Sequence, residues 1–423
     1  MGHKMTFIAT GDSFITRRIP PTPPKSFTNL ISLIQKAEVR FTNLEVTIHN
    51  LEGFPAANSG GTWAVASPTV LKDLKIFGFN LVNWANNHTL DYLYGGLEST
   101  EKYLNEYGFV HSGVGQNLAE ASEPKYLDCS SGRVALIGVT STFHDFARAG
   151  EQRRDMIGRP GINPLRIETI YHLTKKRIQQ LITIASDLEM DISHWHDKIS
   201  NKSFFQFDNY VIMESKYKGS HRKLLKTDIN RILKAIEEAK RQADYIIVSI
   251  HSHESPYGLD FPADFLEVFA KQCIDYGAHA IVGHGPHTIR GIEIYKNRPI
   301  FYSLGNFIFQ NETVTKLPHD FYEEWNLSHF DNVADAFDAR KRAFDFGNNK
   351  SFWESIVPFW TMENGELKDL TLYPIELGYG LARYQRGWPT LSNKQNILEK
   401  VKGLSKTFDT KIEIDQSIGK VIL

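Results

Sequence analysis

Cysteine is nearly absent from this chain of 423 residues, which contains only Cys129 and Cys273. Two thiols in so long a chain cannot build the disulfide framework that stabilises small secreted domains. A long apolar run is missing as well, because Gly11 and Asp12 interrupt the first apolar stretch, which is too short for a signal sequence or a membrane span. We therefore expect a cytoplasmic protein without an anchor.

An excess of charge of one sign is also missing. Lys and Arg total 48 while Asp and Glu total 49, so the net charge is −1 and no overall field attracts nucleic acid or an anionic membrane. Hydrophobic residues make up 41% and charged residues 23%, an ordinary globular composition that excludes extended disorder and coiled-coil or collagen-like chains. We expect a folded protein whose partner is a small-molecule or peptide substrate.

Short β-rich runs alternate with helix-like segments along most of the chain. The expected strands are 6–10, 39–41, 80–84, 134–139, 245–250 and 280–282, and the expected helices are 29–37, 70–77, 97–107 and 265–276. This alternation predicts a layered α/β fold, in which functional residues lie in the loops beyond the strand ends.

Two regions depart from the alternation. Residues 146–241 are charged and helix-like, which predicts a helical insertion or lid within a catalytic domain at residues 1–350. Residues 351–423 are β-rich, with a hairpin expected around Asn364 and a final amphipathic helix at 397–408. We expect this last part to be an extension that packs on the core.

Side chains of the kinds that bind metals follow the expected strands. His284 and His287 flank a Gly-Pro turn and can converge on one point, and His251 directly follows an apolar run. Asp12 and Glu45 add carboxylates at two further strand ends. Mixed nitrogen and oxygen ligands suit manganese, iron or zinc, so we predict a metal centre.

The segment around residue 87 and the residues after His251 add further candidates. Asn87 can ligate through its amide oxygen, while the adjacent His88 is directed elsewhere and is free to exchange a proton. His253 would share a face with His251 if the strand continued. Taken singly, each residue also fits a turn, a cap or a hydrogen-bonded surface, but their recurrence at successive strand ends favours a site.

These residues resemble the CapA, or poly-γ-glutamate synthesis protein, family within the calcineurin-like metallophosphoesterase superfamily. The similar strings cover nearly the whole chain and are ATGDSF, TNLE, NWANNH, GRPGINPLR, VSIHSHE, GHGPH and FYSLGNFIF. The resemblance implies a four-layer α/β/β/α sandwich with one or two divalent ions between the strand-end loops.

The resemblance also implies roles for individual residues. The metal ligands that it implies are Asp12, Glu45 as a bridging carboxylate, Asn87, His251, His284 and His287. His88 would exchange a proton beside the metals, and Glu254 would orient His251. Phe14 stands where the superfamily has a histidine, so one metal lacks a nitrogen ligand. His253 is the candidate to supply that nitrogen, or to act with His88 as a second catalytic histidine.

Arg17 and Arg18 follow Asp12 and offer bidentate donors to a substrate carboxylate or phosphate, although chance placement on the surface is the alternative.

Three functions stay open. The first is a metal-dependent hydrolase of a phosphoester, amide or γ-glutamyl-type substrate, which the resemblance links to poly-γ-glutamate or capsule metabolism. The second is a metal-dependent peptide epimerase, and the third is a non-catalytic, metal-stabilised component of polymer synthesis. The presence of His88 favours an enzyme.

Overall fold

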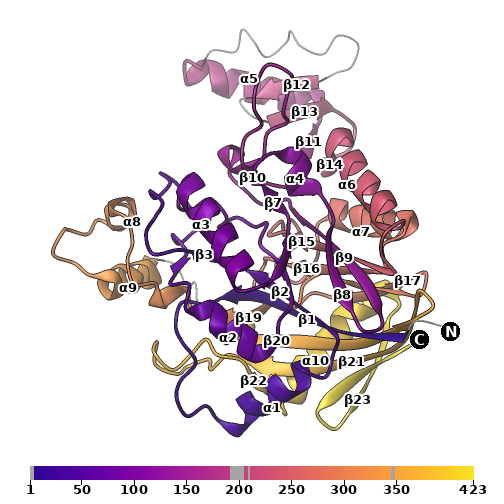
Figure 1. The fold of residues 1–423 in the computed structure, drawn as a ribbon. Helices are drawn as coiled ribbons and strands as arrows, with labels where there is room; N and C mark the ends of the chain where they lie inside the picture. The colour runs from indigo at the N-terminus through magenta and orange to yellow at the C-terminus, as the bar shows by residue number, and fades with distance from the viewer. Residues whose placement is uncertain (1–3, 191–203, 208–209, 344–347) are drawn as a thin grey trace.

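The structure, a computed structural model, describes residues 4–190, 204–207, 210–343 and 348–423. A ten-stranded sheet and a six-stranded sheet form the body of the molecule (Figure 1). The larger sheet contains β1 (Lys4–Phe14), β2 (Val39–Leu44), β5 (Leu81–Asn83), β6 (Val110–Ser112), β19 (Asn306–Phe309), β20 (Glu354–Glu363), β21 (Glu366–Glu376), β22 (Thr390–Leu391), β23 (Lys411–Asp415) and β24 (Ile418–Ile422). Its order is β23-β24-β21-β20-β1-β2-β5-β6, with β19 beside β1 and β22 beside β21.

The six-stranded sheet runs in the order β17-β18-β16-β15-β9-β8. Its strands are β8 (Lys125–Cys129), β9 (Gly132–Thr140), β15 (Tyr245–His251), β16 (Ala280–His284), β17 (Ile292–Tyr295) and β18 (Arg298–Phe301). Two short pairs lie outside the sheets: β3 (Thr47–Ile48) with β4 (Val65–Ala66), and β7 (Val114–Gly115) with β10 (Gly161–Ile162). The predicted strands at 39–41, 134–139, 245–250 and 280–282 are confirmed.

Helices cover the outer faces of the two sheets. On the larger sheet lie α1 (Lys25–Ile34), α2 (Val70–Phe77) and α3 (Leu93–Glu106), and on the smaller sheet lie α6 (Lys226–Ala239) and α7 (Asp264–Tyr276). The remaining helices are α4 (Leu118–Ser122), α5 (Lys175–Asp187), α8 (His319–Glu324), α9 (Val333–Ala343), α10 (Gln395–Ser405) and the short 3₁₀ turns η1 (Asp145–Ala147), η2 (Asn311–Thr313), η3 (Lys350–Trp353) and η4 (Lys406–Phe408). Within the described ranges, no helix is both long and apolar enough to cross a membrane.

The core between the two sheets follows from the alternation of side chains along the strands. Phe7 of β1 faces the smaller sheet, where its ring lies 5.4 Å from that of Tyr245, and it stacks on Trp360 of β20 at 5.2 Å. The next residue, Ile8, points to the opposite face and joins the core under α1 and α2. Each buried aromatic or aliphatic side chain of this kind contributes about 1.5–3 kcal/mol. The expected α/β/β/α layers are therefore present.

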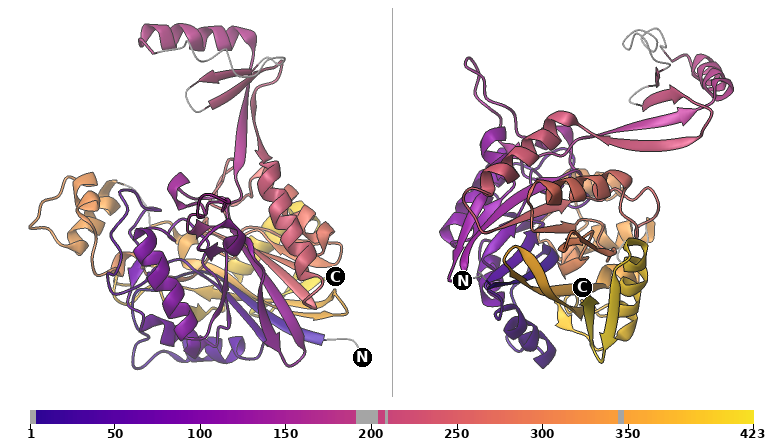
Figure 2. Two further views of the ribbon diagram at one scale, coloured as in Figure 1. Left: turned by 45° about the horizontal axis from the view of Figure 1, so that its top comes forward. Right: turned by 90° about the vertical axis from the view of Figure 1, so that its right-hand side faces the viewer.

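The region 146–241 differs from the helical insertion that we predicted. It contains a four-stranded sheet, in the order β12-β13-β11-β14, which projects from the body together with α5 (Figure 2). The strands of this projecting sheet are β11 (Ile167–Leu173), β12 (Phe204–Phe207), β13 (Tyr210–Glu214) and β14 (Gly219–Leu224). Exposed and partly buried side chains alternate along β14 with a period of two, which its charged residues concealed in the sequence.

The two ends of the region 146–241 pack on the body. Asn163 of the GRPGINPLR string donates its Nδ2 to the carbonyl of Gly138 in β9 at 2.9 Å, and Arg166 pairs with the buried Asp228 of α6 at 2.7 Å. Helix α6 then buries Ile232 and other apolar residues against the six-stranded sheet. Among the described residues, β11–β14 and α5 project, and Ile167 and Leu224 at their base pack against the core of the six-stranded sheet.

The C-terminal residues 351–423, which we expected to be a β-rich extension packed on the core, add strands β20–β24 to the ten-stranded sheet. The expected hairpin is present, with Asn364 at φ 53° and Gly365 at φ 78° joining β20 to β21, and its first strand pairs with β1. Asparagine and glycine adopt this left-handed geometry at low cost, which makes the turn predictable. The partner of the hairpin was not predictable, because β1 lies more than 300 residues earlier in the chain.

Candidate metal centre

The carboxyl ends of β1, β2, β15 and β16 meet at one place, where the predicted ligands gather. Asp12 lies inside β1, whose register shifts on both sides of this residue, so its side chain turns out of the regular pleat. A Cβ at the preceding Gly11 would lie 1.7 Å from the carbonyl oxygen of Gly305, so only glycine fits there. The backbone N–H of Gly285 donates to Oδ2 of Asp12 at 2.9 Å.

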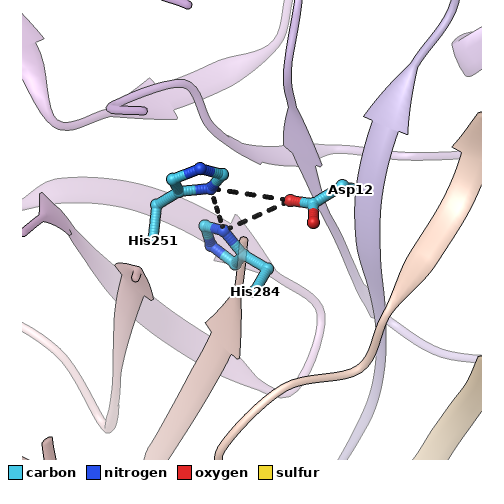
Figure 3. A group of neighbouring side chains, drawn as sticks. All are labelled: Asp12, His251 and His284. Atoms are coloured by element: carbon cyan, nitrogen blue, oxygen red, sulfur yellow. Dashed lines mark hydrogen bonds and ion pairs between the residues drawn. The ribbon is translucent and has the colours of Figure 1, made fainter. Parts of the chain in front are cut away.

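A first group of ligand-type atoms comes from Asp12, His251 and His284 (Figure 3). The Nδ1 atoms of His251 and His284 lie 2.9 Å apart, and Oδ1 of Asp12 lies 3.6 Å and 3.5 Å from them. All three residues are fully buried. Three such atoms directed at one another from three strands are able to hold one divalent ion.

A second group comes from Glu45, His253 and His287, whose ligand-type atoms all lie within 4.8 Å of one another. Neither carboxylate oxygen of the buried Glu45 has a hydrogen-bond partner among the described residues. Such a group costs free energy unless a cation or a donor compensates it. The residues therefore fit a second ion.

The imidazole of His251 joins the two groups. Its Nδ1 faces the first group, whereas its Nε2 lies 2.9 Å from Nε2 of His253 and 3.6 Å from Oε1 of Glu45. The Oδ1 atom of Asn87 lies 2.7 Å from the same Nε2. The sequence predicted these residues as ligands or, for His253, as a ligand or a catalytic partner, and the structure brings all of them together.

The pKa values follow from burial. Burial raises the pKa of Glu45 well above its ordinary value, and the carboxylates of Asp12 and Asp91 add to this. Burial also lowers the pKa values of His251 and His253 well below the ordinary range and that of His284 to about 3. The imidazoles are thus neutral, which is the form that binds metals.

Residues that the sequence analysis did not single out support these ligands. Asn43 donates its Nδ2 to Oδ1 of Asp12 at 2.8 Å, and Oγ of Ser249 lies 2.7 Å from Nε2 of His284. Oδ1 of Asn306 lies 2.9 Å from Nδ1 of His287. Such partners fix the ring orientation of a ligand. Asn43 and Asn306 lie in the strings TNLE and FYSLGNFIF, which was an available signal.

His88 lies beside the two groups and is held by Asp91. Its Nδ1 is 2.7 Å from Oδ2 of Asp91, which also accepts from the backbone N–H of Ala64 at 2.7 Å. His88 lines a cavity of about 30 Å³ together with His287 and Phe14. Asp91 was missed, although it follows His88 by three residues and this spacing was a usable signal.

Three predicted residues are directed elsewhere. Glu254 accepts hydrogen bonds from the hydroxyls of residues 141, 142 and 252 at 2.8–3.1 Å rather than contacting the His251 ring, so the expectation that it orients this ring is wrong. Arg17 donates to backbone carbonyls of residues 384 and 386, and Arg18 forms a bidentate pair with Asp73 at 2.6 and 2.9 Å. Neither arginine is among the described residues that line the cavity beside His88.

The sequence profile of the family described as "Bacterial capsule synthesis protein PGA_cap" matches residues 6–311, well over half of the chain. The chain belongs to this family. The matched segment contains every residue of the two ligand groups as well as His88 and Asp91. The resemblance to CapA proteins is thereby confirmed.

Proteins similar to this chain differ in how much of it they match. The uncharacterized protein y4sH of Sinorhizobium fredii is 33% identical over 433 residues, covering 99% of this chain and 93% of that protein. The capsule biosynthesis protein CapA of Bacillus anthracis is 29% identical over 252 residues, covering 59% of this chain and 45% of that protein.

The solved structures that match this chain have low sequence identity to it. A hypothetical protein from Thermus thermophilus has a TM-score of 0.40 and 11% identity, covering 88% of this chain and 99% of its own. A putative 5′-nucleotidase from Staphylococcus aureus has a TM-score of 0.38 and 12% identity, covering 96% of this chain and 58% of its own.

Proposed function

We propose that this protein is a metal-dependent hydrolase that acts on a phosphoester, amide or γ-glutamyl-type bond. The observation that carries the proposal is the buried Glu45 carboxylate, which has no hydrogen-bond partner among the described residues and lies beside neutral imidazoles. A buried carboxylate in such surroundings is explained by a bound cation. The adjacent pair of His88 and Asp91 supplies a group that can transfer a proton.

The side chains present fit one or two divalent ions. Asp12, His251 and His284 would hold one ion, and Glu45, His253 and His287 would hold a second, with Asn87 beside the His251 ring. A divalent ion at this place supplies Lewis-acid stabilisation of the negative charge that develops on a substrate oxygen. Manganese, iron and zinc all accept such mixed ligands.

His88 is the residue that we assign to proton transfer. Asp91 lies at Nδ1 of His88 and fixes the orientation of the ring. Nε2 of His88 is therefore the atom that would donate a proton to the leaving group. The edge of the Phe14 ring packs at 5.4 Å from the His88 ring and keeps water from one side. Phe14 thus has a packing role at the position where the superfamily pattern has a ligand.

The names of the relatives suggest a substrate class. The Bacillus anthracis protein is named for capsule biosynthesis and a Bacillus subtilis relative, 42% identical over 86 residues, is named for PGA biosynthesis. A γ-glutamyl amide is therefore one substrate to test beside phosphoesters.

The geometry supports hydrolysis better than the two alternatives. An epimerase needs a second free base, whereas the Nε2 of His253 lies 2.9 Å from Nε2 of His251 within the ligand-type groups. A purely structural metal would not require the His88–Asp91 pair at a cavity. Deuterium uptake at a peptide α-carbon without bond cleavage would favour the epimerase.

The test combines metal analysis with a hydrolysis panel. Purified protein is loaded with manganese, analysed for bound metal, and assayed on phosphomonoesters, phosphodiesters and γ-glutamyl peptides with and without chelator. We expect turnover that chelator removes and that His88→Ala reduces without loss of metal. The exposed His221 provides the matched control, since His221→Ala should change neither quantity. Turnover that persists in His88→Ala would contradict the proposal.

A further inference from the structure

Helix α9 brings a guanidinium group to the cavity beside His88. The described residues that line this cavity are Phe14, Gly60, Gly61, Thr62, His88, His287, Phe309, Asn311 and Arg340. Arg340 is the only lysine or arginine among them. It lies outside residues 6–311, the segment that the family profile matches, and it was not singled out in the sequence.

Packing of α8 and α9 determines where Arg340 lies. Phe337 of α9 is buried and its ring lies 5.5 Å from that of Phe321 in α8, which in turn lies 6.3 Å from Trp63. The Nη1 atom of Arg340 donates to Oγ1 of Thr62 at 2.6 Å. This hydrogen bond fixes the guanidinium beside Thr62, which also lines the cavity.

The electrostatic surroundings place this positive charge close to the ligand groups. Burial lowers the pKa of Arg340, while Glu324 and Glu312 oppose the shift, and an arginine remains protonated under such conditions. His287, a residue of the second ligand group, lines the same cavity as Arg340. Arg340 therefore acts electrostatically on the same centre.

The size and chemistry of the cavity indicate what it can accept. A volume of about 30 Å³ holds about two water molecules, so only an end group of a substrate enters. A guanidinium offers two parallel donors that match the oxygens of a carboxylate or phosphoryl group. Arg17 and Arg18, the arginines expected to do this, bond to the carbonyl of Arg386 and to Asp73 and are not among the described residues that line the cavity.

We propose that Arg340 binds an oxyanion of the substrate in this cavity, next to His88 and His287. The inference rests on the proposed function, because it assigns the substrate class of the same site: a molecule with a terminal phosphoryl or carboxylate group. Arg340 is thus the residue that selects an anionic substrate.

The experiment measures anion binding to manganese-loaded protein by calorimetry, with inorganic phosphate and glutarate as separate probes. We expect Arg340→Ala to weaken binding of at least one probe by about 10- to 100-fold, the effect of losing hydrogen bonds to a charged group. Arg340→Lys should restore part of the loss. Metal content and the thermal unfolding midpoint are recorded for every variant and should not change.

Two control variants separate anion binding from a structural role. Arg342 is exposed on the same helix, so Arg342→Ala should bind both anions as the wild type does. Thr62→Val removes the hydrogen bond to Arg340 but keeps the guanidinium, so its loss should be smaller than that of Arg340→Ala. A loss in Thr62→Val as large as in Arg340→Ala would show a structural role and overturn the inference.

Each remaining outcome has a defined meaning. Weaker binding of phosphate alone supports a phosphoryl substrate, and weaker binding of glutarate alone supports a carboxylate. Unchanged binding of both probes in Arg340→Ala, or no binding by the wild type, overturns the inference even if the enzyme is active. Binding that depends on Arg340 without any chelator-sensitive turnover instead refutes the hydrolase and leaves the anion site in place.

Discussion

The strand-end cluster contrasts with the projecting sheet of β11–β14. The cluster consists of Asp12, Glu45, Asn87, His251, His253, His284 and His287. Both regions are rich in polar side chains. In the cluster, Asp12, Glu45, His251 and His284 are fully buried. In β14 of the projecting sheet, exposed and partly buried side chains alternate, as on a solvated surface. Burial, rather than polarity, separates a site from a surface.

The difference also concerns what stabilises each region. The projecting sheet is held by a small apolar core of its own, in which Ile212 and Ala185 of α5 are buried. In the cluster, both carboxylate oxygens of Glu45 lack a hydrogen-bond partner among the described residues. We therefore expect a bound cation to stabilise the cluster but not the projecting sheet.

The largest effect is expected from removing one ligand of the cluster. His284→Ala should lower manganese affinity by more than about 100-fold, since loss of a supporting residue alone costs about 10- to 100-fold, and turnover should disappear. Equilibrium dialysis with elemental analysis measures the bound metal. Full manganese content in His284→Ala would show that His284 is not a metal ligand and that its burial in the cluster has another cause.

The next effect concerns proton transfer beside the cluster. Asp91→Asn should leave metal content unchanged and lower the turnover number roughly 100-fold, because the His88 ring loses its negatively charged partner. Asp187→Asn, on the exposed surface of α5, is the matched control and should behave as the wild type. Equal turnover of the two variants would remove His88 from the mechanism.

A smaller effect is expected from a buried histidine outside the cluster, where no metal is involved. Burial lowers the pKa of His111 to about 4, while its Nδ1 accepts from Nε1 of Trp84 at 3.2 Å. The folded state therefore takes up a proton less readily than the unfolded chain. The contribution of neutral His111 to the free energy of unfolding is complete above about pH 6.5 and falls as the pH decreases toward 4.

His111→Gln keeps a donor and an acceptor but removes this titration. In chelator-treated protein, the wild type should lose about 1.5 kcal/mol more of its free energy of unfolding than His111→Gln between pH 6.5 and 5, because the slope rises toward about 1.4 kcal/mol per pH unit only below pH 6.5. Urea unfolding at the two pH values measures the difference. Parallel losses in both proteins would show that His111 is not the group responsible.

The smallest effect is expected from removing the projecting sheet. Ile167 and Leu224 are paired neighbours at the base of the projecting sheet, so residues 168–223 can be replaced by an Asn-Gly turn. The shortened protein should bind as much manganese as the full chain and be stabilised by it equally, because the bonds that Arg222 makes to Asp264, from its backbone N–H and its guanidinium, involve no residue of the cluster. Reduced metal content would mean that the projecting sheet supports the cluster.

The candidate ligands were recognisable in the sequence for a physical reason. In a layered α/β fold, the ends of strands converge, so short strings such as GHGPH bring several ligand-type side chains to one place. The strands at 134–139, 245–250 and 280–282 were also readable from their apolar runs. By contrast, charged residues hide the strands of the projecting sheet, so the sequence pattern predicts a helical region where β11 lies.

The sequence did not predict which groups the long side chains contact. Arg17, Arg18 and Glu254 lie near ligands in the sequence, yet each bonds to a group that the fold brings to it, such as Asp73 or the hydroxyl of Ser141. Nothing in the local sequence identifies such a partner. An arginine or glutamate in a loop reaches in many directions, and the nearest complementary group decides among them.

By itself, the sequence determined the alternation of strands and helices, the kinds of ligand atoms and the family, because these depend on local pattern and on short strings. Only the tertiary structure decided that Asp91 holds His88, that His251 joins the two ligand groups, and that Arg340 reaches their cavity from α9. Arg340 lies more than 250 residues from His88 in the chain. Contacts over such distances arise from packing of whole layers, which no local pattern records.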